Sequence, residues 1–370
     1  MPDLETSLTY CTYCPKLCRH TCPVSHAEAK ETLTPQTKMA NLRRLHLQTV
    51  TGAEAKAHTD PLYGCTGCGA CTEACLHGVE VGPSLFIGRA EAERDGRGHE
   101  ALRDLPARFV AHARAAADEI RESIPQRRRP AEAQVAFLPG CGAPGLAATM
   151  LALCDRLGAD YVAVADTTLA CGGYPLLAAG QHDEFRLHAE RFVKELRGYA
   201  RVVMHCPSCA HTMKRDYARF GVPVPFQVEH TVEFLESFTE RLPIQQKRGR
   251  VFYHDPCYLG RHQGLYDPPR RLANKAVDEL VEFSRNRGES ECSGGGGLLP
   301  ITMPSTASAI ADHRLTEVKE AHADTVVTSC SSCKKQLTRD GVTAVDLIEL
   351  LNAATTPATT AATTPATTPR

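Results

Sequence analysis

Short apolar runs bounded by turn residues recur along the chain from about residue 134 onward. A run of this kind that ends at Gly, Pro or Cys is typical of a buried strand, and the longer mixed segments between such runs are typical of helices. The predicted strands cover residues 134–138, 160–165, 201–204, 251–253, 279–283 and 325–328. The predicted helices cover residues 146–157, 185–196 and 307–320. This alternation predicts an α/β fold with parallel sheets.

The chain before residue 134 has a different pattern, because helical spacing replaces the strand-like runs. Met39, Leu42 and Leu45 stand at helical spacing, and residues 89–129 are charged and alanine-rich with an apolar stripe. We therefore expect a helical domain over residues 1–90 and a helical linker over residues 91–133. Residues 353–370 form an Ala/Thr/Pro repeat without apolar periodicity, which predicts a disordered tail.

Residues 134–240 and 241–352 repeat one order of strands and cysteines, with an offset of 116 to 124 residues. The first module contains Cys141, Cys171, Cys206 and Cys209, and the second contains Cys257, Cys292, Cys330 and Cys333. Ligands in open α/β sheets collect at the carboxyl ends of the strands, so each module should gather four thiols at one edge of its sheet. Cys154 lies outside this scheme on an apolar helical run, and we expect it to be a buried structural thiol.

The other eight cysteines form two dense runs near the N-terminus. The first run is Cys11, Cys14, Cys18 and Cys22, and the second is Cys65, Cys68, Cys71 and Cys75. Such spacing suits a [4Fe–4S] cluster, because a tight loop lets three sulfurs reach three irons of one cube, and the fourth cysteine binds the other cluster in two-cluster ferredoxins. We therefore expect one cluster on Cys11, Cys14, Cys18 and Cys75, and another on Cys65, Cys68, Cys71 and Cys22.

These runs depart from the usual pattern in two details, and they have two alternative interpretations. Three residues separate Cys14 from Cys18, and Leu76 follows Cys75 where proline is usual. Structural zinc prefers two separated C-x2-C pairs, and a disulfide framework needs an oxidising compartment. Residues 1–10 lack the basic and apolar regions of a signal peptide, so we expect a cytoplasmic protein with iron–sulfur clusters.

Composition excludes several other classes of function. The 370 residues include 42 Lys and Arg against 43 Asp and Glu, a net charge of −1, and they include no Trp. A balanced charge and few aromatic residues argue against a nucleic-acid partner. The apolar runs are far shorter than the roughly 20 residues that cross a bilayer, so we expect no transmembrane segment of its own.

Together, the double cysteine run and the two repeated modules resemble the heterodisulfide reductase-like iron–sulfur proteins. These include the iron–sulfur subunits of anaerobic glycerol-3-phosphate dehydrogenase, glycolate oxidase and lactate utilisation systems. The stretch Tyr253–Arg261, Arg285–Arg287 before Cys292, and Gly294–Gly297 after it are very like the family's second module. The resemblance covers about residues 8–350. It implies a helical two-cluster ferredoxin domain followed by two cysteine-rich modules with small parallel sheets.

Each module departs from the family's Cys-Cys-Gly motif by one cysteine. Gly172 and Ser293 stand at the second cysteine when the motifs are aligned on the following glycine, and a shifted alignment places Ala170 and Glu291 there. In the disulfide-reducing relatives, five cysteines per module hold a non-cubane double cluster. Four thiolates still ligate an ordinary [4Fe–4S] cluster, so up to two more clusters are expected in the modules.

Two functional hypotheses follow from the resemblance. In the first, the chain is an electron-transfer subunit between a flavoprotein dehydrogenase or electron-transfer flavoprotein and a quinone or other carrier. A membrane-bound quinone-reducing subunit is then a further implied partner, holding the chain at the membrane surface. In the second, the modules catalyse reduction of a disulfide. The missing cysteines favour the first, and the absence of a flavin or nicotinamide motif predicts that the chain is not active alone.

Several other residues could serve the clusters or the fold alone. His254 and Asp255 could tune a cluster through hydrogen bonds, or pack and cap the strand end. His205 and His211 flank the first C-x-x-C and are expected to be capped or solvated rather than ligands. The Gly294–Gly297 run is expected to let backbone amides approach a cluster closely.

Overall fold

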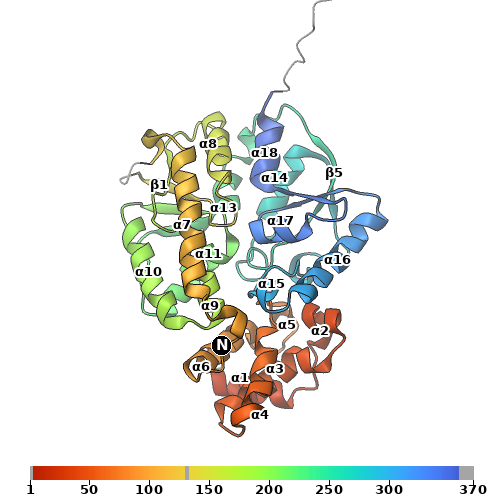
Figure 1. Ribbon diagram of the computed structural model, residues 1–370. Helices are drawn as coiled ribbons and strands as arrows, with labels where there is room; N and C mark the ends of the chain where they lie inside the picture. The colour runs from red at the N-terminus through yellow and green to blue at the C-terminus, as the bar shows by residue number, and fades with distance from the viewer. Residues whose placement is uncertain (1–2, 130–132, 358–370) are drawn as a thin grey trace, which may run out of the picture.

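The computed structural model describes residues 3–129 and 133–357 in three parts, with a helical N-terminal domain below two α/β modules that stand side by side (Figure 1). The N-terminal domain contains α1 (Leu4–Tyr13), α2 (Pro23–Glu28), α3 (Pro35–His46), α4 (Gly52–Thr59), α5 (Ala70–Glu73) and α6 (Val81–Arg94). The 3-10 turns η1 (Arg19–Thr21), η2 (Glu31–Leu33) and η3 (Asp60–Tyr63) connect them. This part is helical, as the sequence predicts.

Helix α3 shows why these residues form helices. Thr34 caps it by accepting a hydrogen bond from the Thr37 backbone N–H, and Pro35 occupies its first turn. Met39, Leu42 and Leu45 are buried on one face against α1 and α6. The helical spacing read from the sequence therefore identifies the core face of this domain.

Helix α7 (Leu105–Ser123) follows the N-terminal domain and packs against the first module. The strands of that module are β1 (Val135–Leu138), β2 (Val162–Val164), β3 (Arg201–Met204) and β4 (Gln227–His230). Its helices are α8 (Leu146–Arg156), α9 (Tyr174–Ala179), α10 (His182–Leu196), α11 (Pro207–His211), α12 (Tyr217–Arg219) and α13 (Thr231–Glu236), with a π-helical turn η6 (Thr212–Asp216) before α12.

The second module repeats this topology. Its strands are β5 (Arg248–Tyr253), β6 (Val277–Glu282), β7 (Thr325–Thr328) and β8 (Thr343–Asp346). Its helices are α14 (Asp267–Ala276), α15 (Leu299–Thr302), α16 (Pro304–Glu320), α17 (Ser331–Leu337) and α18 (Leu347–Thr355), with η8 (Arg287–Glu289) after β6. The sheets are parallel, with strand orders β2-β1-β3-β4 and β6-β5-β7-β8.

The sequence pattern predicts three strands per module, and the structure adds a fourth at the edge of each sheet. Strands β4 and β8 carry mixed polar sequences and are therefore not marked by an apolar run. Helix α18 extends through Thr355, so residues 353–355 of the predicted tail are helical. The rest of the tail prediction, from residue 358, lies outside the described residues.

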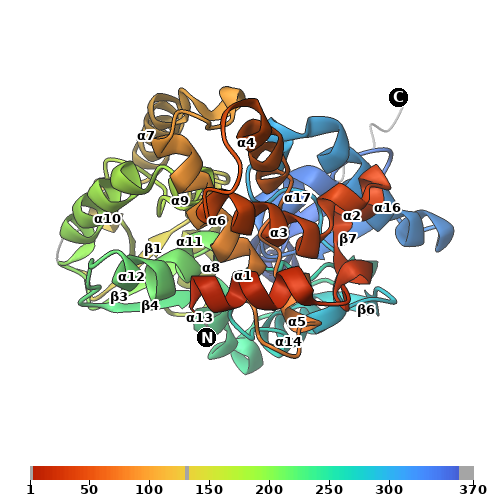
Figure 2. The same cartoon turned by 90° about the horizontal axis from the view of Figure 1, so that it is seen from below.

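The modules share one apolar core, formed by α8 and α13 of the first and α14 and α18 of the second. Seen from below, the N-terminal domain lies across the junction of both modules (Figure 2). Helix α2 packs on α16, and α6 packs on α9. Within the described ranges, we find no helix that combines the length and apolar character needed to cross a bilayer.

Candidate iron–sulfur centres

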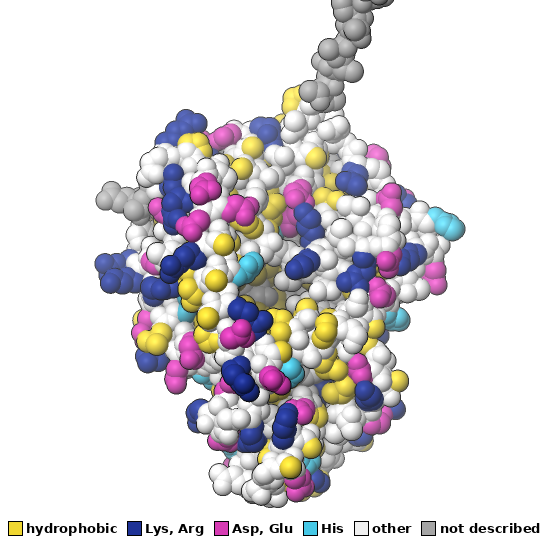
Figure 3. Space-filling view, viewed as in Figure 1, with side chains coloured by type: hydrophobic (Ala, Val, Ile, Leu, Met, Phe, Trp, Pro, Cys, Tyr) yellow, Lys and Arg dark blue, Asp and Glu magenta, His cyan; other side chains and the backbone are white. Residues whose placement is uncertain are grey.

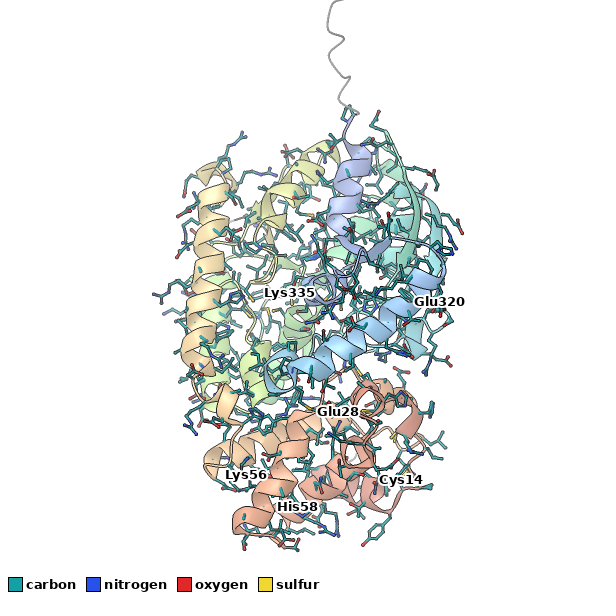
Figure 4. All side chains as sticks on the ribbon, turned by 45° about the vertical axis from the view of Figure 1, so that its right-hand side comes forward. Cys14, Glu28, Lys56, His58, Glu320 and Lys335 are labelled. Carbon is teal, nitrogen blue, oxygen red and sulfur yellow. The ribbon has the colours of Figure 1, made fainter. Side chains whose placement is uncertain are left out.

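One group of thiols lies at the far end of the N-terminal domain. Cys11, Cys14, Cys18 and Cys75 line one cavity together with Cys71, and we call the first four the outer quartet. Burial raises the pKa of the Cys11 thiol to about 12, and the neighbouring thiols of the same quartet add to the shift. In Figure 4, Cys14 lies farther from the modules than Glu28, which marks the junction with α16.

A second group lies between the outer quartet and the modules. Cys22, Cys65, Cys68 and Cys71 line a second cavity, and we call them the inner quartet. Burial raises the pKa of the Cys71 thiol, and the thiols of Cys68, Cys65 and Cys22 raise it further. Cys22 and Cys75 thus lie with the run opposite their own, which is the exchange expected from the sequence. Iron ligation by these eight thiols stays a prediction.

The first module brings its four cysteines to the carboxyl end of its sheet. Cys141 follows β1, Cys206 follows β3, and Cys209 lies in α11. The Cys171 thiol interacts with those of Cys141 and Cys209, and the Cys209 thiol also interacts with that of Cys206. Four thiols therefore form one compact group, as the repeat predicts.

The second module gathers its thiols in the same way. The Cys292 thiol interacts with that of Cys257, and the Cys330 thiol interacts with that of Cys333. The Cys330 thiol and burial raise the pKa of Cys333 most, and the nearby Cys257 thiol raises it further. Cys154 is fully buried in α8, which confirms its expected place in the core.

Gly172 and Ser293, the positions of the missing cysteines, each donate a hydrogen bond to a thiol of their own module. The Gly172 backbone N–H lies 3.2 Å from the Cys209 Sγ, and the Ser293 hydroxyl lies 3.3 Å from the Cys333 Sγ. Hydrogen bonds to ligand sulfurs are one means of tuning the potential of a cluster. These two hydrogen bonds therefore each support one thiol of their module.

Contacts between quartets join all three parts of the molecule. The Cys68 thiol of the inner quartet interacts with the Cys292 thiol of the second module. This interaction is the largest cause of the raised pKa of Cys68. The Cys330 thiol of the second module acts on the Cys206 thiol of the first only through its charge, which helps to raise the pKa of Cys206 after Cys209 and burial. The sequence does not predict these interactions, because they join cysteines of different domains.

The flanking histidines and Asp255 have structural partners. His205 Nε2 lies 2.8 Å from Asp346 Oδ2 in a fully buried pair between the modules. Burial alone would lower the pKa of His205, but the Asp346 carboxylate opposes this and leaves the pKa raised. Asp255 accepts two hydrogen bonds from Arg270, both at 2.8 Å. His205 is therefore buried rather than solvated and is capped by Asp346, one of the two expected arrangements, and Asp255 anchors a helix.

The glycine run after Cys292 has two uses. The Gly294 backbone N–H donates to the Cys292 Sγ at 3.3 Å, in line with the expected approach of amides to a cluster site. Gly296 and Gly297 instead approach the N-terminal domain, where a Cβ on Gly297 would lie 2.0 Å from the Cys65 carbonyl oxygen. The run therefore also fits the second module against the inner quartet.

A cavity of about 930 Å³ lies between the N-terminal domain and the second module. Its walls come from η1, α2, α5, η8 and α16, and they carry His20, His26 and His313. Cys292 is the one cysteine in its lining, so this cavity reaches the thiols of the second module.

The donor set fits iron–sulfur clusters better than the alternatives. All 17 cysteines are free thiols, which excludes the disulfide framework in this structure. Throughout residues 3–129 and 133–357, no group of three or more Cys, His, Asp or Glu is arranged to hold a single metal ion. Quartets of thiols with few other donors are the usual ligand sets of [4Fe–4S] clusters.

Comparison with known proteins agrees with this arrangement. A family model described as a 4Fe-4S dicluster domain matches residues 7–79. A second model, described as a cysteine-rich domain, matches twice, over residues 135–214 and 251–338. The chain therefore belongs to the iron–sulfur proteins that join a dicluster domain to two cysteine-rich domains.

Relatives define the group more closely. One subunit of the dihydromethanophenazine:CoB–CoM heterodisulfide reductase from Methanosarcina acetivorans is 26% identical, over 89% of this chain and 88% of the relative. One subunit of the fumarate reductase (CoM/CoB) from Methanothermobacter marburgensis is 29% identical, over 79% of this chain and 61% of the relative. An EtfAB:quinone oxidoreductase from Syntrophomonas wolfei is 26% identical, over 41% of this chain and 22% of the relative. The chain is thus a homologue of this heterodisulfide reductase subunit and an iron–sulfur subunit of the electron-transfer type.

Proposed function

We propose that this chain relays electrons between a flavoprotein and a quinone or another carrier. The observation that carries the proposal is the contact between Cys68 and Cys292, because it joins the inner quartet to the second module. The Cys206 thiol also feels the charge of Cys330, and the Cys71 thiol feels that of Cys18, so thiols follow one another from the outer quartet to the first module. Clusters held on these thiols would supply one-electron chemistry.

The surface around the outer quartet suits the entry of electrons from a partner. Leu76 and Leu17, which line the outer cavity, are 88% and 53% exposed. Exposed leucines beside a thiol quartet would suit contact with another protein. On the face shown in Figure 3, charges of both signs are interspersed, so no field of a single sign covers that face. We propose a dehydrogenase or electron-transfer flavoprotein as this partner, and a quinone-reducing membrane protein as a further one.

The experiment is to purify the full chain anaerobically, determine iron and acid-labile sulfide, and follow reduction by EPR. We expect on the order of 8 to 16 iron atoms per chain, at four per cubane cluster. Reduced electron-transfer flavoprotein should then reduce the clusters, while the chain alone oxidises no organic substrate. Stoichiometric zinc without charge-transfer absorption would contradict the proposal. Recovery in the soluble fraction without a partner, and in the membrane fraction with one, would test the proposed cytoplasmic location.

A second candidate function is reduction of a disulfide at the second module. The 930 Å³ cavity favours it, because Cys292 lies in its lining while Cys171 of the first module does not. An assay with reduced viologen and a panel of disulfides separates the two functions. If the chain reduces disulfides rapidly, and Cys292→Ala abolishes this turnover while the matched control Cys171→Ala keeps it, the chain is a reductase. That result would overturn the simple relay.

A further inference from the structure

Three cations, two of them buried and one partly buried, surround the inner quartet. Lys38 in α3 is 1% exposed, Arg89 in α6 is 0% exposed, and Arg261 lies after the first cysteine of the second module. Among the described residues, none of the three forms an ion pair with a carboxylate. A buried charge without an opposite charge is strongly unfavourable, so its presence points to a compensating negative group nearby.

Lys38 points at the inner thiols themselves. Its Nζ lies 3.8 Å from the Cys22 Sγ, and this ammonium group reaches no other hydrogen-bond acceptor among the described residues. Burial raises the pKa of the Cys65 thiol, and the positive charges of Lys38 and Arg89 oppose that rise. Two of the four inner thiols therefore face the charge of Lys38.

Arg89 and Arg261 bind the backbone beside the other inner positions. Arg89 donates to the carbonyl oxygens of Leu62 and Cys65, and also to those of Ala178 and Gly297 in the modules. Arg261 Nε donates to the Cys68 carbonyl oxygen at 2.7 Å. Its Nη2 is buried without a hydrogen-bond partner, so part of its donor capacity is left unused.

The outer quartet lacks this arrangement. Among the groups that shift the pKa values of Cys11 and Cys18, burial comes first, and the charged side chains that contribute are all thiols. The nearby Lys16 and Arg19 both pair with Glu31, and their side chains are 36% and 63% exposed. Charges of this kind are screened by water, whereas buried charges act over the same distances with far less screening.

We propose that Lys38, Arg89 and Arg261 raise the reduction potential of the inner site above that of the outer site, so that electrons entering the chain collect beside the second module. A cluster with four thiolates carries net negative charge, and each added electron increases it, so fixed positive charges favour the reduced form. This inference rests on the proposed function, because it requires a cluster on the inner quartet.

Lys38→Met is the main test, because methionine keeps most of the side-chain volume and removes the charge. Lys38→Arg keeps the charge, and Lys16→Met removes an exposed, paired cation beside the outer quartet. Anaerobic EPR redox titrations of the full chain would give the two potentials, with Cys68→Ser and Cys14→Ser assigning the signals to the inner and outer sites. Arg261→Gln is a second test at a different thiol, in case Lys38→Met assembles poorly.

For Lys38→Met we expect the ratio of reduced to oxidised inner cluster to fall at least tenfold at the wild-type midpoint, a shift of about 59 mV. Lys38→Arg should stay within threefold of the wild type, and Lys16→Met should leave both potentials unchanged. An inner potential that is unchanged in Lys38→Met and Arg261→Gln, with both clusters present, would overturn this inference alone. A wild-type chain without iron would overturn it together with the proposed function.

Discussion

The two cysteine-rich modules share one strand order, but different neighbours cover their thiols. In the first module, residues 205–226 join β3 to β4 and include η6 and α12, whereas the shorter segment 329–342 joins β7 to β8 in the second. Tyr217 of the longer segment is fully buried and donates a hydrogen bond to the Gly172 carbonyl oxygen at 3.0 Å. In the second module, Cys292 instead meets Cys68 of the N-terminal domain and lines the large cavity.

Because different neighbours cover their thiols, the two modules have different connections although they share one fold. The first module covers its thiols with its own chain, and its quartet meets the second module through Cys206. The second module connects on both sides, to the inner quartet and to the first module. We infer that electrons from the N-terminal domain reach the second module before the first.

The largest effect should come from filling the contact between the second module and the inner quartet. In Gly297→Ala, the new Cβ would lie 2.0 Å from the Cys65 carbonyl oxygen, and the φ of +60° is unfavourable for alanine. We expect a loss of about 3–5 kcal/mol in the free energy of unfolding and a loss of iron from the inner site. Gly341→Ala is the matched control, because its φ is +83° but its Cβ would meet open space. Equal losses in the two variants, measured by urea unfolding, would contradict the close contact.

The next effect concerns the caps at equivalent positions of the two modules. Asp346 caps α18 and pairs with His205, whereas His230 caps α13 and donates to the His205 carbonyl oxygen. Asp346→Ala should cost about 3–5 kcal/mol, because it leaves a buried imidazole without its charged partner. His230→Asn keeps a capping oxygen and should cost about 1 kcal/mol. Chemical denaturation would measure both, and a loss in His230→Asn as large as that in Asp346→Ala would refute the role of the ion pair.

The third effect is a dependence of stability on pH that comes from His182 of the first module. His182 packs edge-on against Phe220, which follows α12 in the longer segment, and burial with the charge of Arg94 lowers its pKa to about 4. Between pH 6.5 and 4 the unfolded chain binds a proton that the folded chain does not, so stability falls as pH decreases through this range. At about 1.36 kcal/mol per pKa unit, the loss is at most roughly 3 kcal/mol. In urea unfolding at pH 7, 6 and 5, the free energy of unfolding of His182→Phe should fall less steeply with decreasing pH than that of the wild type. An unchanged pH dependence would rule out His182 as its cause.

The smallest effect compares two fully buried tyrosines. Tyr217 of the first module hydrogen-bonds the Gly172 carbonyl oxygen, whereas the hydroxyl of Tyr253 in β5 of the second has no partner among the described residues. Tyr217→Phe should therefore cost about 1 kcal/mol, and Tyr253→Phe should be neutral or slightly stabilising. Thermal unfolding of the two variants side by side measures the difference. If Tyr253→Phe destabilised the chain more than Tyr217→Phe, the hydrogen bond of Tyr217 would not stabilise the segment that covers the thiols of the first module.

Much of the architecture follows from local patterns. The apolar runs before Cys141, Cys206 and Cys257 predict strands, and the structure places β1, β3 and β5 there. Strands β4 and β8 could not be predicted in this way, because each lies at a sheet edge where polar side chains are tolerated. Lys38 and Arg89 carry no sequence signal, since a single cation in a helix is usually exposed.

By itself, the sequence determined the four cysteine quartets, the helical character of the N-terminal domain and the repeat of two α/β modules. Spacing and periodicity express these features, because they depend on residues close together in the chain or on a repeated pattern. The tertiary structure alone decided that Cys68 meets Cys292, that the charge of Cys330 acts on Cys206, and that three cations surround the inner thiols. These contacts join residues far apart in sequence, and they form only when the modules pack on each other and on the N-terminal domain.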